Sequence, residues 1–453
     1  MAPRGIAVPN NASLTAAAHS SPVYRVFQLL LLAAAASTAN YIRTTLGPLQ
    51  EAMRVSLSLS DNHVAILQGL AVALPLALGG IPIGLLADRI SRKVLLVTSL
   101  CFALIASILS SFAGSFGFLL FARFLTGLSL PGMYICAYAM AGDLFGPEHR
   151  GRATTVVAIG EIGGPPAAFA LGGALLVMLA SSPWMKFADW PLPDWGWSLL
   201  WMGGATLPVL LLLLLLLHEP PRREVAVEKP PVRVVWRELW KYRAVAMPLQ
   251  LARATLFIAD GAVYVWGAPL FSRKFHMAPD RIGAVLGLAL LAGGLFGPAL
   301  GGPLVDFCQR RGGPRRTMVI LTVIAALSSP FGLFPLLPDS TWAAVALAAF
   351  LTLGYSIAAA ALALTLIVIP GELRGLNIGI SLMVGALFFV GLAPLAVSGL
   401  SVALGGEMMI GNALAIVCAV AVLLSSAVFA STARYFPGAD PTTAIKSPDF
   451  SLH

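Results

Sequence analysis

Charge is scarce in this chain. Asp, Glu, Lys and Arg make up 11% of the 453 residues, whereas 58% are hydrophobic and the mean hydropathy is +0.86. Soluble domains carry about 25% charged residues, so this composition excludes one and predicts an integral membrane protein. A net charge of +9 would suggest a nucleic-acid partner in a soluble protein. We expect none here, because the basic residues concentrate in the loops between apolar runs.

Motifs of several other protein classes are absent. The sequence contains no G-x-x-x-x-G-K-[ST] phosphate-binding loop, which argues against a primary pump, and no H-E-x-x-H pair, which argues against a zinc hydrolase. The four cysteines have no C-x-x-C spacing, so we interpret them as apolar thiols. We therefore expect a protein that is not an enzyme, with no catalytic residues, cofactor or metal site.

The long apolar runs predict transmembrane helices. Segments such as 209–217 and 343–369 are apolar on nearly every face and lack the alternation of a β-barrel strand. A helix needs about 20 apolar residues to span a bilayer. We predict an all-α membrane protein with twelve spans, at 24–46, 63–87, 93–113, 117–142, 152–180, 197–217, 244–272, 281–306, 316–337, 341–369, 374–402 and 406–434.

The loop charges predict the orientation. About 21 Lys and Arg residues fall on the side of the termini and about 5 on the other, which by the positive-inside rule places both termini in the cytoplasm. We expect a multi-pass inner (plasma) membrane protein. Residues 27–39 could also be interpreted as a signal-peptide core, but its removal would break the repeat described next.

The chain contains an internal repeat. Gly84-Leu-Leu-Ala-Asp88-Arg89 follows one apolar run, and Gly302-Pro-Leu-Val-Asp306 follows another roughly 218 residues later. Parallel halves in so apolar a chain indicate a transporter built from two six-helix bundles. The predicted units are a tail (1–22), a first bundle (23–217), a linker (218–243), a second bundle (244–435) and a second tail (436–453). The end of the linker is either an amphipathic helix on the membrane surface or a charged connection.

These motifs resemble a known family. Gly84-x-Leu-x-Asp88-Arg89-x-x-Arg92-Lys93 is similar to the loop signature of the major facilitator superfamily. Arg123-x-x-x-Gly127 and the glycine-proline segment 160–165 are similar to two more of its motifs. The resemblance covers the whole chain and implies a monomeric transporter that works by alternating access.

Shorter pieces resemble the Spinster-like branch of that superfamily. They are Asn40-Tyr41, Leu59-Ser-Asp61 and the segment 142–145. Two departures stand out. The branch pattern N-Y-x-D-R has Arg43 here at its acidic position, and R-x-x-x-G-x-G-E-A continues here as Leu128-Ser-Leu-Pro131, without the glutamate. Both membrane acids of the branch are missing, which weakens any transfer of its proton-coupling scheme or lipid substrates.

Five ionisable residues fall deep within predicted spans. An ionisable side chain there costs at least about 2.5–3.5 kcal/mol, so it normally faces a cavity or a partner. The five are Arg43, Arg123, Glu161, Arg253 and Asp260. We assign Glu161 and Asp260 to proton coupling and the three arginines to an anionic substrate. The repeat offset places Arg43 opposite Asp260, as a gate, a coupling pair or a static ion pair, and Arg123 and Arg253 could instead extend towards the headgroups.

Polar and aromatic residues supply the rest of the expected substrate site. They are Asn40, Tyr134, Tyr138, Tyr264 and Tyr355, although packing alone could also explain the tyrosines. By resemblance to the superfamily, a cytoplasmic gate is expected at the inner ends of the helices. Its residues would be Gly84, Asp88, Arg89, Arg92, Asp143, Glu148, Arg150, Asp306, Arg310 and Arg374.

The predicted function is therefore secondary active transport of a small anionic or amphiphilic organic substrate, coupled to protons. The partners would be the substrate, the proton or another coupling ion, and the lipid bilayer. A lysolipid- or sphingolipid-type translocase, or a facilitative uniporter on the same scaffold, is the alternative. A non-transporting receptor also remains open, although gate motifs retained in both halves argue against it.

Overall fold

The computed structural model describes residues 21–145, 147–186, 190–222, 232–369 and 371–435. Every regular element in these ranges is a helix. The helices of the first part of the chain are α2 (Pro22–Thr44), α3 (Gln50–Ser56), α4 (Asp61–Gln68), α5 (Leu70–Arg89), α6 (Arg92–Ser111), α7 (Phe116–Leu144), α8 (Pro147–Ser181), α9 (Asp194–Gly204) and α10 (Leu207–Leu216). Those of the second part are α11 (Val232–Lys241), α12 (Arg243–Phe275), α13 (Pro279–Gly332), α14 (Ser340–Val368), α15 (Gly371–Gly385), a π-helical segment (Ala386–Leu392), α16 (Ala393–Leu404) and α17 (Ile410–Thr432).

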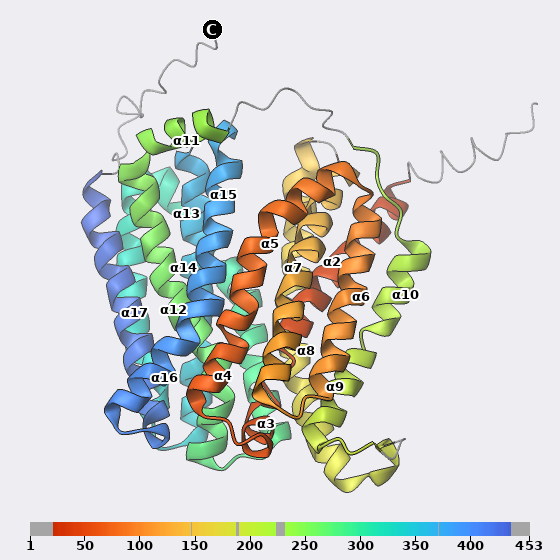
Figure 1. The fold of residues 1–453 in the computed structure, drawn as a ribbon. Coiled ribbons are helices and arrows are strands. Elements are labelled where there is room, and N and C mark those ends of the chain that lie inside the picture. Colours follow the sequence, from red (N-terminus) through yellow and green to blue (C-terminus); the bar gives the residue numbers. More distant parts are fainter. Residues whose placement is uncertain (1–20, 146, 187–189, 223–231, 370, 436–453) are drawn as a thin grey trace, which may run out of the picture.

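Two large cores hold most of these helices together. The first joins buried residues from Leu29 to Leu217 and lies within α2–α10, here called the N-terminal bundle. The second joins residues from Leu249 to Ala433 and lies within α12–α17, the C-terminal bundle. Phe169 of the N-terminal bundle packs into the second core, and Val390 of the C-terminal bundle packs into the first. The two bundles stand side by side in Figure 1 and meet along these contacts.

Eleven helices among the described residues are long and apolar enough to cross a membrane. The prediction of twelve differs because the eighth and ninth expected spans form one element, α13. A straight helix of 54 residues would be about 80 Å long, far more than the roughly 30 Å of a bilayer core. The helix is broken at Gly313, whose φ of 65° favours glycine. The chain is thus an all-helical, multi-pass membrane protein in which α13 supplies two passes.

The linker between the bundles contains a helix. Of the two alternatives for its closing part, the structure has the helical one, α11. Leu239 is buried against Ile369 and Leu373, whereas Trp240 is exposed. In Figure 1, α11 lies across the top of the C-terminal bundle, and the short helices α3 and α4 lie at the opposite end. These ends are called the α11 end and the α3 end below.

Candidate functional site

Small residues let α2 and α8 approach closely near the middle of the N-terminal bundle. A Cβ atom on Gly160 would lie 2.4 Å from the backbone oxygen of Ala33, and one on Gly164 would lie 2.4 Å from that of Ser37. Small residues four apart on one helix face are the pattern that allows this packing in membranes. Glu161 lies beside this contact, so the glycines fix its position against α2.

Asn40 on α2 connects three helices through its side-chain amide. Its Nδ2 donates to the backbone oxygen of Glu161 on α8 (3.2 Å), and its Oδ1 accepts from the Tyr134 hydroxyl on α7 (2.9 Å). The same oxygen accepts from Nε of Arg43 one turn further along α2 (3.0 Å). Asn40 therefore orients Arg43, and the structure brings together four of the predicted site residues.

The Arg43 side chain reaches the C-terminal bundle. Its guanidinium carbon lies 5.2 Å from the centre of the Phe389 ring and 5.5 Å from that of Tyr264, within the range of a cation–π interaction. Phe389 belongs to the π-helical segment, a geometry common at functional sites. A Cβ on Gly261 of α12 would lie 2.1 Å from the Phe389 backbone oxygen, so only glycine permits this approach.

Glu161 and Tyr138 face each other next to Arg43. The Tyr138 hydroxyl interacts with the Glu161 carboxyl, and Arg43 lies within electrostatic range of that carboxyl. The ion pairs of the described residues do not include one between Arg43 and Glu161. Glu161, Arg43 and Tyr138 are half-buried rather than fully buried. Arg43 lies in the last turn of α2 and contacts the C-terminal bundle, so the partial exposure of this group indicates a water-accessible space between the bundles.

Asp260 lies on the other side of this cluster. Its side chain is 3% exposed, and a Cβ on Gly354 of α14 would lie 3.1 Å from its Oδ1. The hydroxyls of Tyr264 and Tyr355 are 3.1 Å apart, and both Arg43 and Asp260 lie within electrostatic range of these tyrosines. An ion pair between Arg43 and Asp260 is not among the contacts of the described residues, because Asn40 and the aromatic rings hold the guanidinium.

The other two membrane arginines bind within the protein. Arg123 is 2% exposed and donates to the backbone oxygens of Arg43 (2.9 Å) and Leu67 (3.4 Å). Arg253 donates to the Ser381 hydroxyl (2.9 Å) and lies 5.5 Å from the centre of the Phe257 ring. Both are more buried than Arg43, so Arg43 is the membrane arginine most accessible to a ligand.

The predicted gate residues of the N-terminal bundle form contacts within that bundle. Arg92 pairs with Asp143 and lies 3.8 Å from Asp88, while Arg150 donates to the backbone oxygen of Gly142. Gly84 faces Ile135 of α7, and Arg89 is exposed.

In the C-terminal bundle, Asp306 and Arg310 are exposed at the α11 end. The side chains of Glu148 and Arg374 lie outside the described residues. Within the described part of the chain, no ion pair joins the two bundles at this end.

Ion pairs join the bundles at the α3 end instead. Arg273 of α12 donates to Glu51 of α3 (2.7 Å) and to the buried Asp61 of α4 (2.7 Å). Arg54 of α3 pairs with Glu407, which precedes α17 (2.9 Å). No role was predicted for these residues from the sequence. Asp61 was recognised only as a motif residue. The sequence did show opposite charges in loops of both halves on the same side of the membrane, and these could have indicated the ion pairs.

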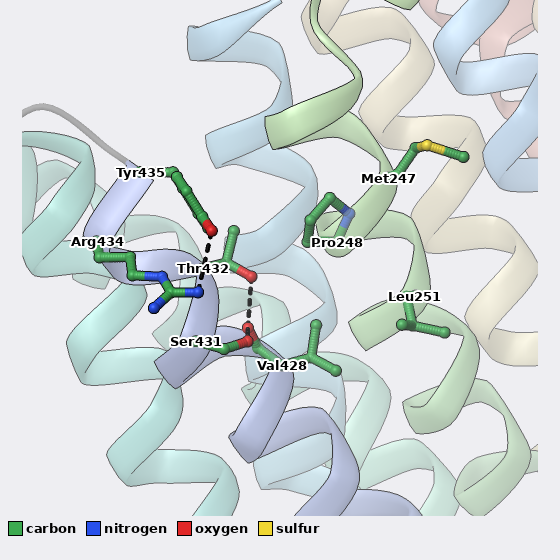
Figure 2. Close-up of a pocket in the computed structure, with 8 residues that line it drawn as sticks. All are labelled: Met247, Pro248, Leu251, Val428, Ser431, Thr432, Arg434 and Tyr435. Carbon is green, nitrogen blue, oxygen red and sulfur yellow. Dashed lines mark hydrogen bonds between the residues drawn. The ribbon is translucent and has the colours of Figure 1, made fainter.

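Two cavities of the described residues lie away from the cluster of Asn40, Arg43, Tyr134, Tyr138 and Glu161, here called the central cluster. One, of about 540 Å³, lies between α12 and α17 near the α11 end and is lined by Met247, Leu251 and Arg434 (Figure 2). Met247 and Leu251 are exposed on the outside of the bundle, so this hollow faces lipid. The other, of about 510 Å³, lies at the α3 end beside Glu51 and Trp195.

The fold and the central cluster define a membrane protein of two helical bundles with charges at their interface, as in transporters. The family model of the Major Facilitator Superfamily matches residues 29–268, and the chain belongs to this superfamily of transporters, which are not enzymes. Two structures of a bacterial homologue of the human lysosomal transporter Spinster, inward-facing and either unoccupied or occupied, match with TM-scores of 0.73 and 0.74. Each match is 20% identical and covers 92% of this chain and 97% of the other, so it shows a shared fold.

Two curated relatives share part of the sequence. One, from Cupriavidus pinatubonensis, is named for 4-methylmuconolactone transport and is 26% identical over 278 residues, 60% of each chain. The other, from Bacillus subtilis, is named for niacin and nicotinamide transport and is 37% identical over 102 residues, 22% of this chain and 25% of the relative. The matched segments therefore span 60% or less of these relatives.

Proposed function

We propose that this protein is a proton-coupled secondary transporter of a small organic anion. The observation that carries the proposal is the half-buried cluster of Arg43, Glu161 and Asn40 at the interface of the bundles. A cation that faces a water-accessible interior and lacks an ion-paired carboxylate is suited to an anionic substrate. The superfamily match and the small organic cargoes named for the relatives support the same class of function.

Coupling of substrate to protons would arise because Arg43 and Glu161 lie close together. An ionised Glu161 and a substrate carboxylate would both be attracted to the one guanidinium, and two carboxylates close together repel each other. Substrate binding is then favoured when Glu161 carries a proton, so anion and proton travel together. Asp260, buried beside Tyr264 and Tyr355, is the second proton carrier in this proposal.

Alternating access would use the contacts at the α3 end. The Arg273 and Arg54 ion pairs join the bundles there, and the described ion pairs at the α11 end stay within one bundle. With the α11 end placed in the cytoplasm by its loop charges, this arrangement is inward-facing. Opening to the outside requires separation of Arg273 from Glu51 and Asp61, while the bundles close at the α11 end.

The test is uptake of radiolabelled organic acids, aliphatic and aromatic, into proteoliposomes with and without an imposed pH gradient. We expect accumulation with the gradient in wild type, and gradient-independent exchange in Glu161→Gln and Asp260→Asn. Asp280→Asn, which changes an exposed acid at the α3 end, is the matched control and should accumulate as wild type does. Flux that ignores the gradient in every variant would indicate a uniporter and refute the coupling.

A further inference from the structure

The central site has features that select a narrower class of substrate than small organic anions. We propose that it binds a flat aromatic monocarboxylate, with the carboxylate on Arg43 and the ring along Phe389 and Tyr264. This inference rests on the proposed transport function and specifies its substrate.

The Arg43 guanidinium supplies the carboxylate site. Its Nε donates to Asn40 Oδ1, and the Tyr134 hydroxyl, which donates to the same oxygen, also lies close to the guanidinium. A ligand carboxylate would bind to the terminal N–H groups that these contacts leave. Arginine presents these nitrogens as a planar fork that matches the two oxygens of a carboxylate. Asn40 is itself held by Tyr134 and by the Glu161 backbone, so the fork is fixed before the ligand arrives.

The aromatic rings around Arg43 supply the second element. Phe389 and Tyr264 pack edge to face with ring centres 5.0 Å apart, and Phe257 packs edge to face on Phe389 at 6.4 Å. All three are half-buried and come from α12 and the π-helical segment. An aromatic ring bonded to a carboxylate is coplanar with it, so a ligand held by the Arg43 fork extends its flat ring past these side chains. Aromatic pairs of this kind add about 0.5–1.5 kcal/mol beyond burial of area.

The tyrosine pair supplies the third element. When the hydroxyls of Tyr264 and Tyr355 share one hydrogen bond, one of them still has a proton to donate. Among the described residues, the hydrogen bonds of these two hydroxyls do not include an acceptor for that proton. A ring nitrogen or ring oxygen on the ligand would complete this hydrogen bond.

Asp260 limits the ligand to one negative charge. It lies within electrostatic range of both Tyr264 and Tyr355, at the position that the far edge of the ring would approach. A second carboxylate on that edge would face Asp260 without a cation of its own, because Arg253 is directed to Ser381. The arrangement therefore disfavours dicarboxylates.

The test is equilibrium binding to the purified full-length protein in nanodiscs, measured by titration calorimetry without any gradient. The probes are benzoate, pyridine-3-carboxylate, benzamide, cyclohexanecarboxylate and benzene-1,4-dicarboxylate. We expect the two aromatic monocarboxylates to bind, benzamide and the dicarboxylate to bind at least tenfold more weakly, and cyclohexanecarboxylate to bind about threefold to tenfold more weakly.

Variants assign each preference to its side chain. Arg43→Gln should abolish discrimination between benzoate and benzamide. Phe389→Leu should abolish discrimination between benzoate and cyclohexanecarboxylate, but it should still bind benzoate more tightly than benzamide. Arg25→Gln, on the same helix but away from the cluster, is the control and should bind as wild type does. Equal binding of benzoate and benzamide, equal binding of benzoate and cyclohexanecarboxylate, or no binding of any probe would overturn the inference. Proton-driven uptake of aliphatic acids together with any of these results would leave the proposed transport function standing.

Discussion

Arg43 of α2 lies with its guanidinium carbon 5.2 Å from the centre of the Phe389 ring, although the two residues belong to different bundles. The contact is made in the middle of the protein, where each bundle would move relative to the other during alternating access. Arg43 is also the residue that stands where the Spinster-like pattern has an acid. The same position therefore joins the proposed substrate site to the interface that would open during alternating access.

Asn40 should control binding through Arg43. Asn40→Leu keeps the side-chain size but removes the hydrogen bonds to Arg43, Tyr134 and the Glu161 backbone. We expect the substrate affinity to fall about tenfold, because a freely rotating guanidinium loses the order that the amide imposes. Asn40→Gln should recover part of the loss. Titration calorimetry of wild type and both variants measures this, and an unchanged affinity in Asn40→Leu would contradict the positioning role.

The two ion pairs at the α3 end should differ in the free energy that they contribute to holding this end closed. Loss of Arg273 leaves the buried Asp61 without its cation, which typically costs about 3–5 kcal/mol, whereas an exposed pair such as Arg54 with Glu407 contributes about 0.2–1 kcal/mol. Arg273→Gln should therefore shift the protein towards the outward-open state, and Arg54→Gln should have little effect.

The measurement is labelling of a cysteine introduced at Tyr355, in a background without the four native cysteines, by an impermeant thiol reagent applied from outside. We expect Arg273→Gln to raise the labelling rate at least tenfold and Arg54→Gln to raise it less than about threefold. Equal rates in the two variants would show that Arg273 does not hold the outer side closed.

Gly261 should be required for the approach of the π-helical segment to α12. A Cβ there would lie 2.1 Å from the Phe389 backbone oxygen, so Gly261→Ala should destabilise the protein by about 1–3 kcal/mol. A Cβ on Gly399 of α16 meets nothing within 4 Å, so Gly399→Ala should be neutral or stabilise by up to about 1 kcal/mol. Thermal unfolding of both detergent-solubilised variants gives the comparison. A melting temperature for Gly261→Ala at or above that of Gly399→Ala would contradict it.

Glu219, after the last turn of α10, should stabilise the α11 end in a pH-dependent way. Burial raises its pKa, but hydrogen bonds from the Ser91 hydroxyl and from the backbone amides of Arg92 and Lys93 outweigh burial, and the pKa is lowered. A carboxyl with a lowered pKa in the folded state stabilises the protein above its unfolded pKa of about 4.3, and this is lost as the pH falls through the folded value.

Glu219→Gln should therefore melt at a lower temperature than wild type at pH 7, and the difference should close as the pH is lowered below about 4. Ser91→Ala keeps the carboxyl but removes one donor to it and also the N-cap of α6, so it should show a smaller pH-dependent difference in addition to a loss that does not vary with pH. Melting temperatures between pH 3 and pH 8 measure both. A difference that does not vary with pH would mean that Glu219 stabilises by packing and not by its charge.

The sequence was sufficient for the fold class because a chain that spans a bilayer forms helices or a closed barrel, and long apolar runs without alternation are compatible only with helices. The two passes of α13 were predicted as separate helices, and the chain does break between them at Gly313. The sequence did not reveal that a single glycine makes this turn. The π-helical segment at Ala386–Leu392 was not predicted either. Its register depends on the contact with Gly261, which lies more than 120 residues earlier in the chain.

For the site, depth in the membrane predicted which ionisable residues lie inside the bundles with internal partners, because burial of an ionisable group needs a reason. Pairing was harder to predict. The repeat offset placed Arg43 opposite Asp260, but side-chain direction and the aromatic residues of the other bundle decide that Arg43 lies over Phe389 and Tyr264. Phe389 was missed because an aromatic residue in an apolar run carries no signal of its own.

If substrate and proton move together, a substrate gradient alone should drive protons across the membrane. Proteoliposomes loaded with a pH-sensitive dye receive an inward gradient of a transported organic acid, without any pH gradient and with the membrane potential clamped. We predict acidification of the lumen in wild type beyond that of protein-free liposomes, and none beyond it in Glu161→Gln, although labelled substrate still exchanges. Substrate entry in wild type with no acidification beyond the protein-free control would contradict the account.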